Sequence, residues 1–75
     1  MTTAEEIKNA AKKAEKSSIR PGCFNLNPPV SIIHVKSGRV LTATRVDIDG
    51  QYPNTVLTGE MGYCWYPAGS FEIVK

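Results

Sequence analysis

The sequence predicts a mainly β fold, a small five-stranded barrel with an N-terminal α-helix. β-branched and aromatic residues are frequent from residue 31 onward, and glycine-containing turns divide this part of the chain into short runs. Near the end, an aromatic run at 63–66 enters a Pro-Ala-Gly-Ser corner at 67–70, and a short apolar run follows at 71–74. Short strands joined by tight turns are typical of a small barrel rather than an open sheet.

Residues 1–17 are predicted to form a helical arm, with the helix itself over 3–16. Apolar residues recur there at helical spacing, at Ala4, Ile7, Ala10, Ala11 and Ala14. Two capping boxes fit its start, Thr3 with Glu6 or Thr2 with Glu5. Because Ile7 is the only large side chain in this stripe, the helix is expected either to lie loosely on the barrel or to dock against a second chain.

Residues 18–30 are predicted to connect the helix to a barrel over 31–75. The consecutive prolines at 28 and 29 supply no N–H donors, so this stretch should not pair as a central strand. The run at 23–26 before them fits either a short edge strand or an apolar plug.

Strands of the barrel are expected at 32–35, 39–48, 52–58, 63–66 and 71–74. Alternation in the second of them predicts one face made of Val40, Thr42, Thr44, Val46 and Ile48. The Asp49-Gly50 pair predicts a two-residue type I′ hairpin, because both positions of that turn require positive φ.

The chain length of 75 residues allows one domain with a small core. A chain of this size buries only about 60% of its unfolded surface, so self-association is expected to supplement its stability. Met1 leads into a charged helix without an apolar signal stretch, which predicts a cytoplasmic protein whose Cys23 and Cys64 are reduced. No run approaches the roughly 18 apolar residues of a membrane span, so no membrane partner is expected.

The formal net charge is +2, and the basic excess lies in residues 1–20. This excess supports an alternative function in nucleic-acid binding, through Lys8, Lys12, Lys13, Lys16 and Arg20, with aromatic side chains stacking on bases. The barrel region is neutral and has three internal cations, which disfavours this alternative.

The sequence offers little catalytic chemistry, and no enzyme, metal or cofactor is predicted. His34 is the only histidine and is expected to be structural. Neither Cys23 nor Cys64 has the spacing to His34 that a zinc motif would show, and no sequence feature arranges a Cys–His nucleophile pair.

The two aspartates beside the expected hairpin are also assigned structural roles. Asp49 is expected to serve the backbone conformation of the turn. Asp47 is expected either to face solvent or to form an ion pair with Arg45 or Arg39 across the strand. The sequence contains no glycine-rich phosphate loop and no nucleophile elbow, so a catalytic reading has no support from motifs.

The aromatic residues are the main functional candidates. Tyr63 and Trp65 share one face of their expected strand, and Cys64 and Tyr66 share the other. A barrel this small buries only one such face, so either Trp65 or Tyr66 should be exposed. Because Trp, Tyr and Arg dominate interface energetics, a partner-binding face is predicted from Trp65, Tyr66, Tyr63, Tyr52, Phe24, Arg39 and Arg45.

Residues 31–75 resemble the SH3-like barrel superfold. The resemblance depends on the turns at 37–38 and 49–50, the Trp-Tyr-Pro-Ala run at 65–68 and the closing run at 71–74. Eukaryotic SH3 domains that bind proline-rich peptides have an acidic loop with paired tyrosines, which this chain lacks before its core strands. The resemblance therefore implies an architecture and no particular activity.

The chain is also similar to the plasmid-encoded type II dihydrofolate reductases in a Lys-Ser-Gly turn at 36–38 and in Tyr66-Pro67. The resemblance would imply a small-ligand or enzyme site at an oligomer axis. However, Cys64 stands where that family has its ligand-binding glutamine, Trp65 where it has isoleucine, and Val35 where it has a lysine. The activity is therefore not carried over.

The leading hypothesis from the sequence is a small non-catalytic protein-binding module. A chain of this size without catalytic apparatus suits an adaptor or inhibitor of the kind that phages and mobile elements often encode. Another protein is the expected partner, with a homo-oligomer as a further expectation.

Overall fold

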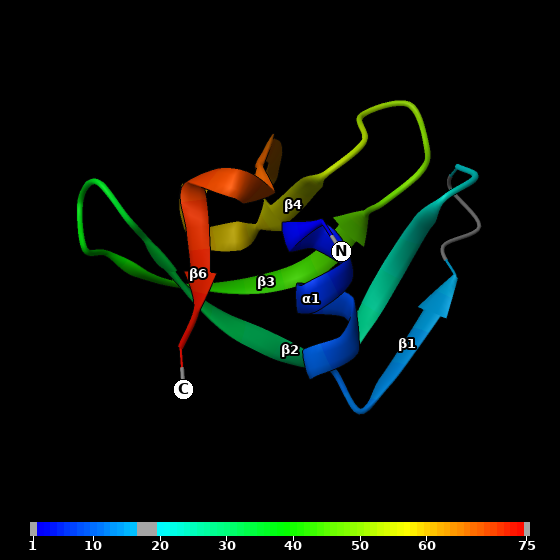
Figure 1. The fold of residues 1–75 in the computed structure, drawn as a ribbon, viewed down its shortest axis with the longest axis horizontal. Helices are drawn as coiled ribbons and strands as arrows, with labels where there is room; N and C mark the ends of the chain where they lie inside the picture. The colour runs from blue at the N-terminus through cyan, green and yellow to red at the C-terminus, as the bar shows by residue number, and fades with distance from the viewer. Residues whose placement is uncertain (1, 17–19, 75) are drawn as a thin grey trace.

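The computed structural model describes residues 2–16 and 20–74. One helix, α1 (Thr3–Ala10), precedes six strands: β1 (Lys13–Lys16), β2 (Cys23–His34), β3 (Val40–Asp47), β4 (Thr55–Thr58), β5 (Cys64–Pro67) and β6 (Phe71–Ile73). Two 3₁₀ turns, η1 (Gly59–Met61) and η2 (Ala68–Ser70), flank β5. The strands form one antiparallel sheet in the order β1-β2-β3-β4-β5, and β6 pairs with β2 (Figure 1).

The predicted mainly β fold with an N-terminal helix is confirmed. The sheet differs from the predicted five-stranded barrel, because it has six strands and is not closed. Among the described residues, β5 pairs with β4 and β6 pairs with β2, and no pairing joins β5 to β6 or to β1. The η2 turn after β5 redirects the chain toward β2, so the last two strands add to different parts of the sheet.

The helix is shorter than the predicted 3–16. It begins at the alternative cap, where the Thr2 hydroxyl accepts the N–H of Glu5 at 3.2 Å, and it ends before Ala11, whose backbone is extended. Residues 13–16 form β1 instead, paired with residues 24–27 of β2. After Ile7 the helical stripe holds only alanines, so a longer helix would bury little, whereas an edge strand gains backbone hydrogen bonds to β2.

The predicted connector over 18–30 is wrong from Cys23 onward, where β2 begins. This strand continues through the two prolines to His34, and the Asn27–Pro28 bond is cis. Its register with β3 shifts between Asn25 and Val30, so the prolines lie at an irregularity where the β3 ladder is interrupted. The missing N–H donors therefore interrupt one ladder without ending the strand.

The predicted face of the second barrel strand is also wrong. The buried positions of β3 are Leu41, Ala43, Val46 and Asp47, and the Val40 side chain is 59% exposed. The pairing of β3 with β4 shifts register between Ala43 and Arg45. Such a bulge places one extra residue in the strand and reverses the inward and outward alternation beyond it.

The predicted two-residue hairpin at Asp49-Gly50 is a longer loop over 48–54. β4 begins at Thr55 rather than at 52, and the positive φ in this loop belongs to Asn54, at 57°. The N–H of Ile48 donates to the carbonyl of Gly22 at 3.1 Å, so the loop is tied to the segment before β2. This long-range contact replaces the local turn that the dipeptide predicts.

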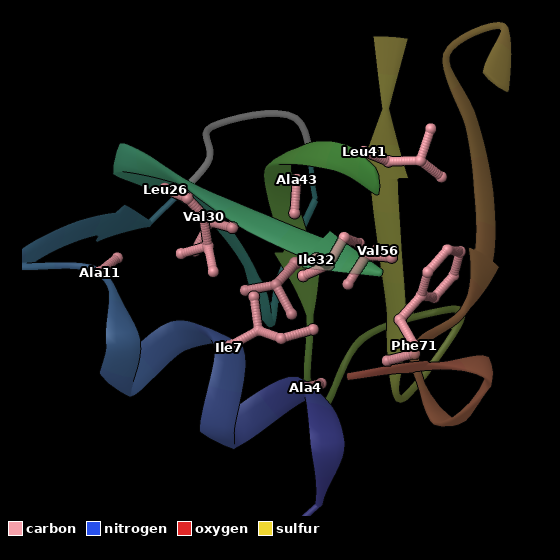
Figure 2. Close-up of a cluster of buried hydrophobic side chains, with 12 residues drawn as sticks. Ala4, Ile7, Ala11, Leu26, Val30, Ile32, Leu41, Ala43, Val56 and Phe71 are labelled. Atoms are coloured by element: carbon pink, nitrogen blue, oxygen red, sulfur yellow. The ribbon is translucent and has the colours of Figure 1, made fainter. Parts of the chain in front are cut away.

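The hydrophobic core lies between α1 and one face of the sheet. Ile7 is fully buried and is the main helical contribution, and η2 and β6 close the core beside α1 (Figure 2). Buried side chains from every layer form a single cluster: Ala4, Ile7, Ala11, Leu26, Val30, Ile32, Leu41, Ala43, Val46, Val56, Ala68 and Phe71. The helix is therefore packed on its own sheet.

Replacing Gly50 with alanine is expected to lower the free energy of unfolding by about 1–3 kcal/mol, the usual cost of overpacking. The added Cβ would overlap the carbonyl oxygen of Pro21 and lie 2.8 Å from Oδ1 of Asp47. Gly69→Ala is the matched control, because its Cβ would have Asn54 Nδ2 at 3.9 Å as its nearest neighbour. Equal midpoints in chemical denaturation for the two variants would contradict this prediction.

Candidate binding face

The face of the sheet opposite α1, called here the outer face, carries a row of large side chains. In the ladder, Arg45 lies opposite Leu57, and Leu57 lies opposite Trp65. Their neighbours Val46 and Val56 belong to the core cluster under α1. Because successive residues of a strand point to opposite faces, Arg45, Leu57 and Trp65 share the outer face.

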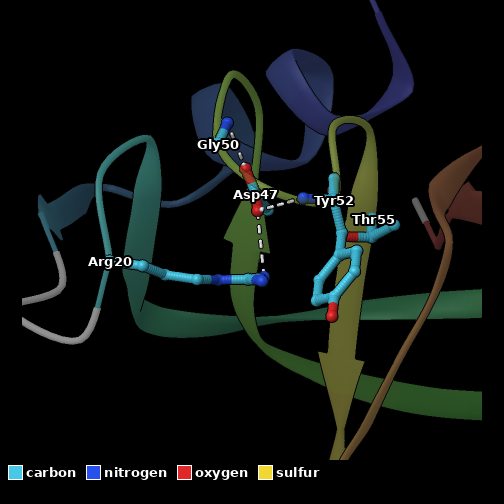
Figure 3. Close-up of polar contacts among 5 residues, drawn as sticks. All are labelled: Arg20, Asp47, Gly50, Tyr52 and Thr55. Atoms are coloured by element: carbon cyan, nitrogen blue, oxygen red, sulfur yellow. Dashed lines mark hydrogen bonds and ion pairs between the residues drawn. The ribbon is translucent and has the colours of Figure 1, made fainter.

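A fully buried carboxylate, Asp47, organises one end of this face (Figure 3). Its Oδ1 accepts the N–H of Gly50 at 2.7 Å, and its Oδ2 accepts the N–H of Tyr52 at 3.1 Å. The Thr55 hydroxyl then donates to the Tyr52 carbonyl at 2.6 Å. These bonds fold the loop over 48–54 around one side chain, so the expectation of Asp47 as a solvent-exposed residue is wrong.

Arg20 is the ion-pair partner of Asp47, in place of the expected Arg45 or Arg39. The Nη2 atom of Arg20 lies 2.9 Å from Oδ2 of Asp47, and only 14% of the Arg20 side chain is exposed. The guanidinium carbon lies 4.6 Å from the ring centroid of Tyr52 and 4.3 Å from that of Trp65. We call Arg20, Asp47, Tyr52 and Trp65 the Arg20 cluster.

The attraction within the Arg20 cluster is mainly a charge interaction. Nη2 of Arg20 is at ion-pair distance from Asp47, yet it makes no directed hydrogen bond within residues 2–16 and 20–74. A buried carboxylate without a nearby cation would be strongly unfavourable, and the faces of two aromatic rings add cation–π attraction. Arg20 therefore neutralises Asp47 and bridges the two rings.

The ladder places Trp65 and Tyr66 on opposite faces, and both are half-buried, so neither is the exposed aromatic that was expected. Tyr66 lies opposite Val56 and packs against the core cluster, whereas Trp65 is half-buried on the outer face against Arg20. Tyr52 joins Trp65 there with its side chain 48% exposed. Of the predicted binding residues, the structure thus brings Trp65, Tyr52 and Arg45 to one face.

The other predicted binding residues lie elsewhere. Phe24 is on the α1 side of the sheet, with the Nζ of Lys8 at 4.1 Å from its ring centroid. Tyr63 is 74% exposed in the turn before β5. Arg39 lies at the far end of β3, where its Nη2 donates to the carbonyl of Glu60 at 3.5 Å. The single aromatic and arginine face predicted from the sequence is therefore smaller than expected.

Glu60 covers an open stretch of the β3 edge. Its carboxylate accepts the N–H of Thr42 at 2.8 Å, beyond the point where the β4 ladder ends at Ala43. A hydrogen bond from its own backbone N–H is the main reason that the pKa of Glu60 lies below its ordinary value, with smaller contributions from Thr42 and Arg39 against the effect of burial. This contact is structural and lies away from the Arg20 cluster.

The five cations of the nucleic-acid alternative do not share one helix. Because α1 ends at Ala10, only Lys8 is on the helix, where it lies over Phe24. Lys13 and Lys16 are on β1, and Arg20 belongs to the Arg20 cluster. Lys12 lies between the helix and β1. A groove of about 570 Å³ includes Lys8, Lys16 and Phe24 in its lining, but also Glu5 and Asp49. Its mixed charge gives no preference for phosphate.

The predicted structural role of His34 agrees with its contacts. Its Nδ1 lies 2.9 Å from the Ser37 hydroxyl, and its ring packs edge-on against Phe71 at 5.3 Å between centroids. Cys23 is buried, Cys64 is exposed, and both thiols are free. In the described part of the chain, no group of three His, Cys, Asp or Glu side chains is arranged to hold a metal ion.

Comparison with known proteins gives no relative for this chain, since no family model, no curated protein and no solved structure matches it. Over residues 2–16 and 20–74, no helix has the length and apolar character needed to cross a membrane.

Sequence reasoning did not identify Asp47 as the residue that organises the loop over 48–54, and it assigned Arg20 to the basic N-terminal segment. A local signal for Asp47 exists, because an aspartate three residues before a glycine often accepts a backbone N–H in a turn. The pairing with Arg20 has no local signal. It depends on the turn at Pro21-Gly22, which brings the segment before β2 against the loop after β3.

Proposed function

We propose that this chain is a non-catalytic protein-binding module that contacts its partner through the outer face around the Arg20 cluster. The observation that carries the proposal is the contact of one guanidinium, that of Arg20, with the rings of Tyr52 and Trp65 and with the buried carboxylate of Asp47. Arg45 continues the same face along the sheet, beside Leu57, which is itself buried at 8% exposure.

Two physical arguments support this face as a binding surface. Tyr, Trp and Arg are the residue types that most often provide large contributions to binding energy at interfaces. The hydrogen bonds to Asp47 and the pairing of β5 with β4 also position Tyr52 and Trp65 before a partner arrives, which reduces the entropy lost on binding. The face therefore combines suitable chemistry with preorganisation.

The proposal is tested by placing a photo-crosslinking amino acid at Arg45 on the outer face and, as a control, at Asn9 on the exposed side of α1. In lysate of the native host, we expect the position-45 variant to form a discrete protein adduct and the position-9 variant to form none. Unlabelled wild-type protein should compete for this adduct, and Trp65→Ala should compete at least about 30-fold more weakly, as for an interface residue of about 2 kcal/mol.

Circular dichroism of Trp65→Ala serves as the folding control for this competition. An adduct that forms only at position 9, or one that nuclease treatment removes, would contradict the proposal. The second of these outcomes would favour the nucleic-acid alternative, whose affinity should fall steeply with salt.

A further inference from the structure

We propose that Asp47, Tyr52 and Trp65 form a binding site for a guanidinium group, called here the guanidinium cradle. Arg20 fills the cradle in the isolated chain, and an arginine side chain of the partner protein takes its place in the complex. The second statement rests on the proposed function, whereas the first concerns the chain alone.

The cradle is assembled without help from Arg20. Both carboxylate oxygens of Asp47 already accept backbone N–H groups, from Gly50 and Tyr52. The Tyr52 backbone is held a second time by the hydroxyl of Thr55, and Trp65 is fixed by the pairing of β5 with β4. Removal of Arg20 would therefore leave the hydrogen bonds that position Asp47 and Tyr52, but it would also leave the buried carboxylate without a counter-ion, which favours the uptake of another cation.

The chemistry of the cradle selects a planar, delocalised cation. A guanidinium can stack on aromatic faces and can present several N–H groups to a carboxylate, and it is more weakly hydrated than an ammonium group. The buried negative charge of Asp47 excludes anionic ligands. A lysine side chain, with its compact and strongly hydrated charge, should bind less well.

Arg20 occupies this site without filling every polar contact in it. Its Nη2 lies 2.9 Å from Oδ2 of Asp47 but makes no directed hydrogen bond in the described residues, and 14% of its side chain is exposed. Tyr52 also remains 48% exposed at the rim. A guanidinium that approaches from solvent can therefore reach Tyr52 at the rim, and it reaches the buried carboxylate as Arg20 leaves.

The test uses Arg20→Ala and exploits Trp65, which is the only tryptophan and so reports on the cradle directly. At constant ionic strength and below denaturing concentrations, methylguanidinium is expected to change the Trp65 fluorescence saturably. Urea, which is planar but neutral, and methylammonium, which is charged but not planar, should give no saturable change. Arg45→Ala is the matched control, because it also lacks one outer-face arginine but keeps the cradle filled.

Wild-type protein should bind methylguanidinium at least about tenfold more weakly than Arg20→Ala, because Arg20 occupies the cradle in most molecules. A tenfold weaker apparent affinity corresponds to a cradle that is empty in about one molecule in ten. If Arg20→Ala does not fold, the same titration is performed on Arg20→Met, which keeps most of the aliphatic part of the side chain. Absence of a saturable response in a folded variant would overturn the guanidinium cradle. So would an equal response to urea.

The partner's arginine is tested separately with the adduct at position 45. Excess N-acetyl-arginine amide should reduce crosslinking at least about tenfold, whereas N-acetyl-lysine amide should not. Crosslinking that persists unchanged would overturn the exchange and leave the proposed function standing. Conversely, a positive titration with no adduct at position 45 would support the cradle and count against the proposed function.

Discussion

Replacing Asp47 with alanine is expected to lower the free energy of unfolding by about 3–5 kcal/mol, the usual result of removing one partner from a buried ion pair. The substitution leaves the N–H groups of Gly50 and Tyr52 without their acceptor. It also leaves the largely buried guanidinium of Arg20 without a counter-ion. Both effects act on the loop that positions Tyr52, so the outer face should lose its order before the core does.

Thermal unfolding followed by circular dichroism provides the measurement for Asp47→Ala. For a domain of this size, each kcal/mol corresponds to roughly 4–8 °C in Tm, so the expected shift is large. Asp49→Ala is the matched control, because Asp49 is exposed in the same loop, and it should change stability by less than about 0.5 kcal/mol. Similar Tm values for the two variants would show that the buried carboxylate does not organise the loop.

Ile7→Ala is expected to destabilise the protein by about 2–5 kcal/mol, the range for truncation of a large aliphatic side chain in a core. Ile7 is fully buried, and every other apolar contact that α1 makes with the core cluster comes from alanine. An eight-residue helix has little stability of its own, so it should detach when this contact is lost.

The control for Ile7→Ala is Ile33→Ala, which makes the same chemical change at a half-buried position of β2. We expect its effect to be about 1 kcal/mol, because less apolar surface leaves water there. Amide hydrogen exchange tests whether α1 detaches in Ile7→Ala. We expect the amides of α1 to lose protection, with or without further loss in the sheet. Full protection of α1 would mean that the alanines alone hold the helix.

Local patterns in the sequence predicted local structure well. The Thr2 cap, the turn at Gly38 and the corner that becomes η2 all depend on residues close together in the chain. The errors occur where distant segments meet. The helix lost its second half to pairing with β2, and the hairpin predicted at 49–50 became a loop around Asp47 because Gly22 and Pro21 lie against it.

The candidate site shows the same division. Residue type placed Trp65, Tyr52 and Arg45 in a list of seven candidates, and strand alternation placed Trp65 and Tyr66 on opposite faces of their strand. The bulge in β3 then decided which residues of that strand share their face. No sequence pattern could assign Arg20 to Asp47, because that ion pair exists only once β2, β3 and the turn before β2 are assembled.

The charged edge strand β1 has a consequence for the behaviour of the protein at high concentration. Unpaired strand edges are templates for aggregation, and lysines on an edge are a common protection. If the β1 strands of two copies paired antiparallel about a two-fold axis, Lys13 of one copy would face Lys16 of the other, and both lysines are exposed. Opposed like charges disfavour such pairing, so growth of fibrils from this edge should be suppressed even though, within residues 2–16 and 20–74, β1 pairs with β2 alone.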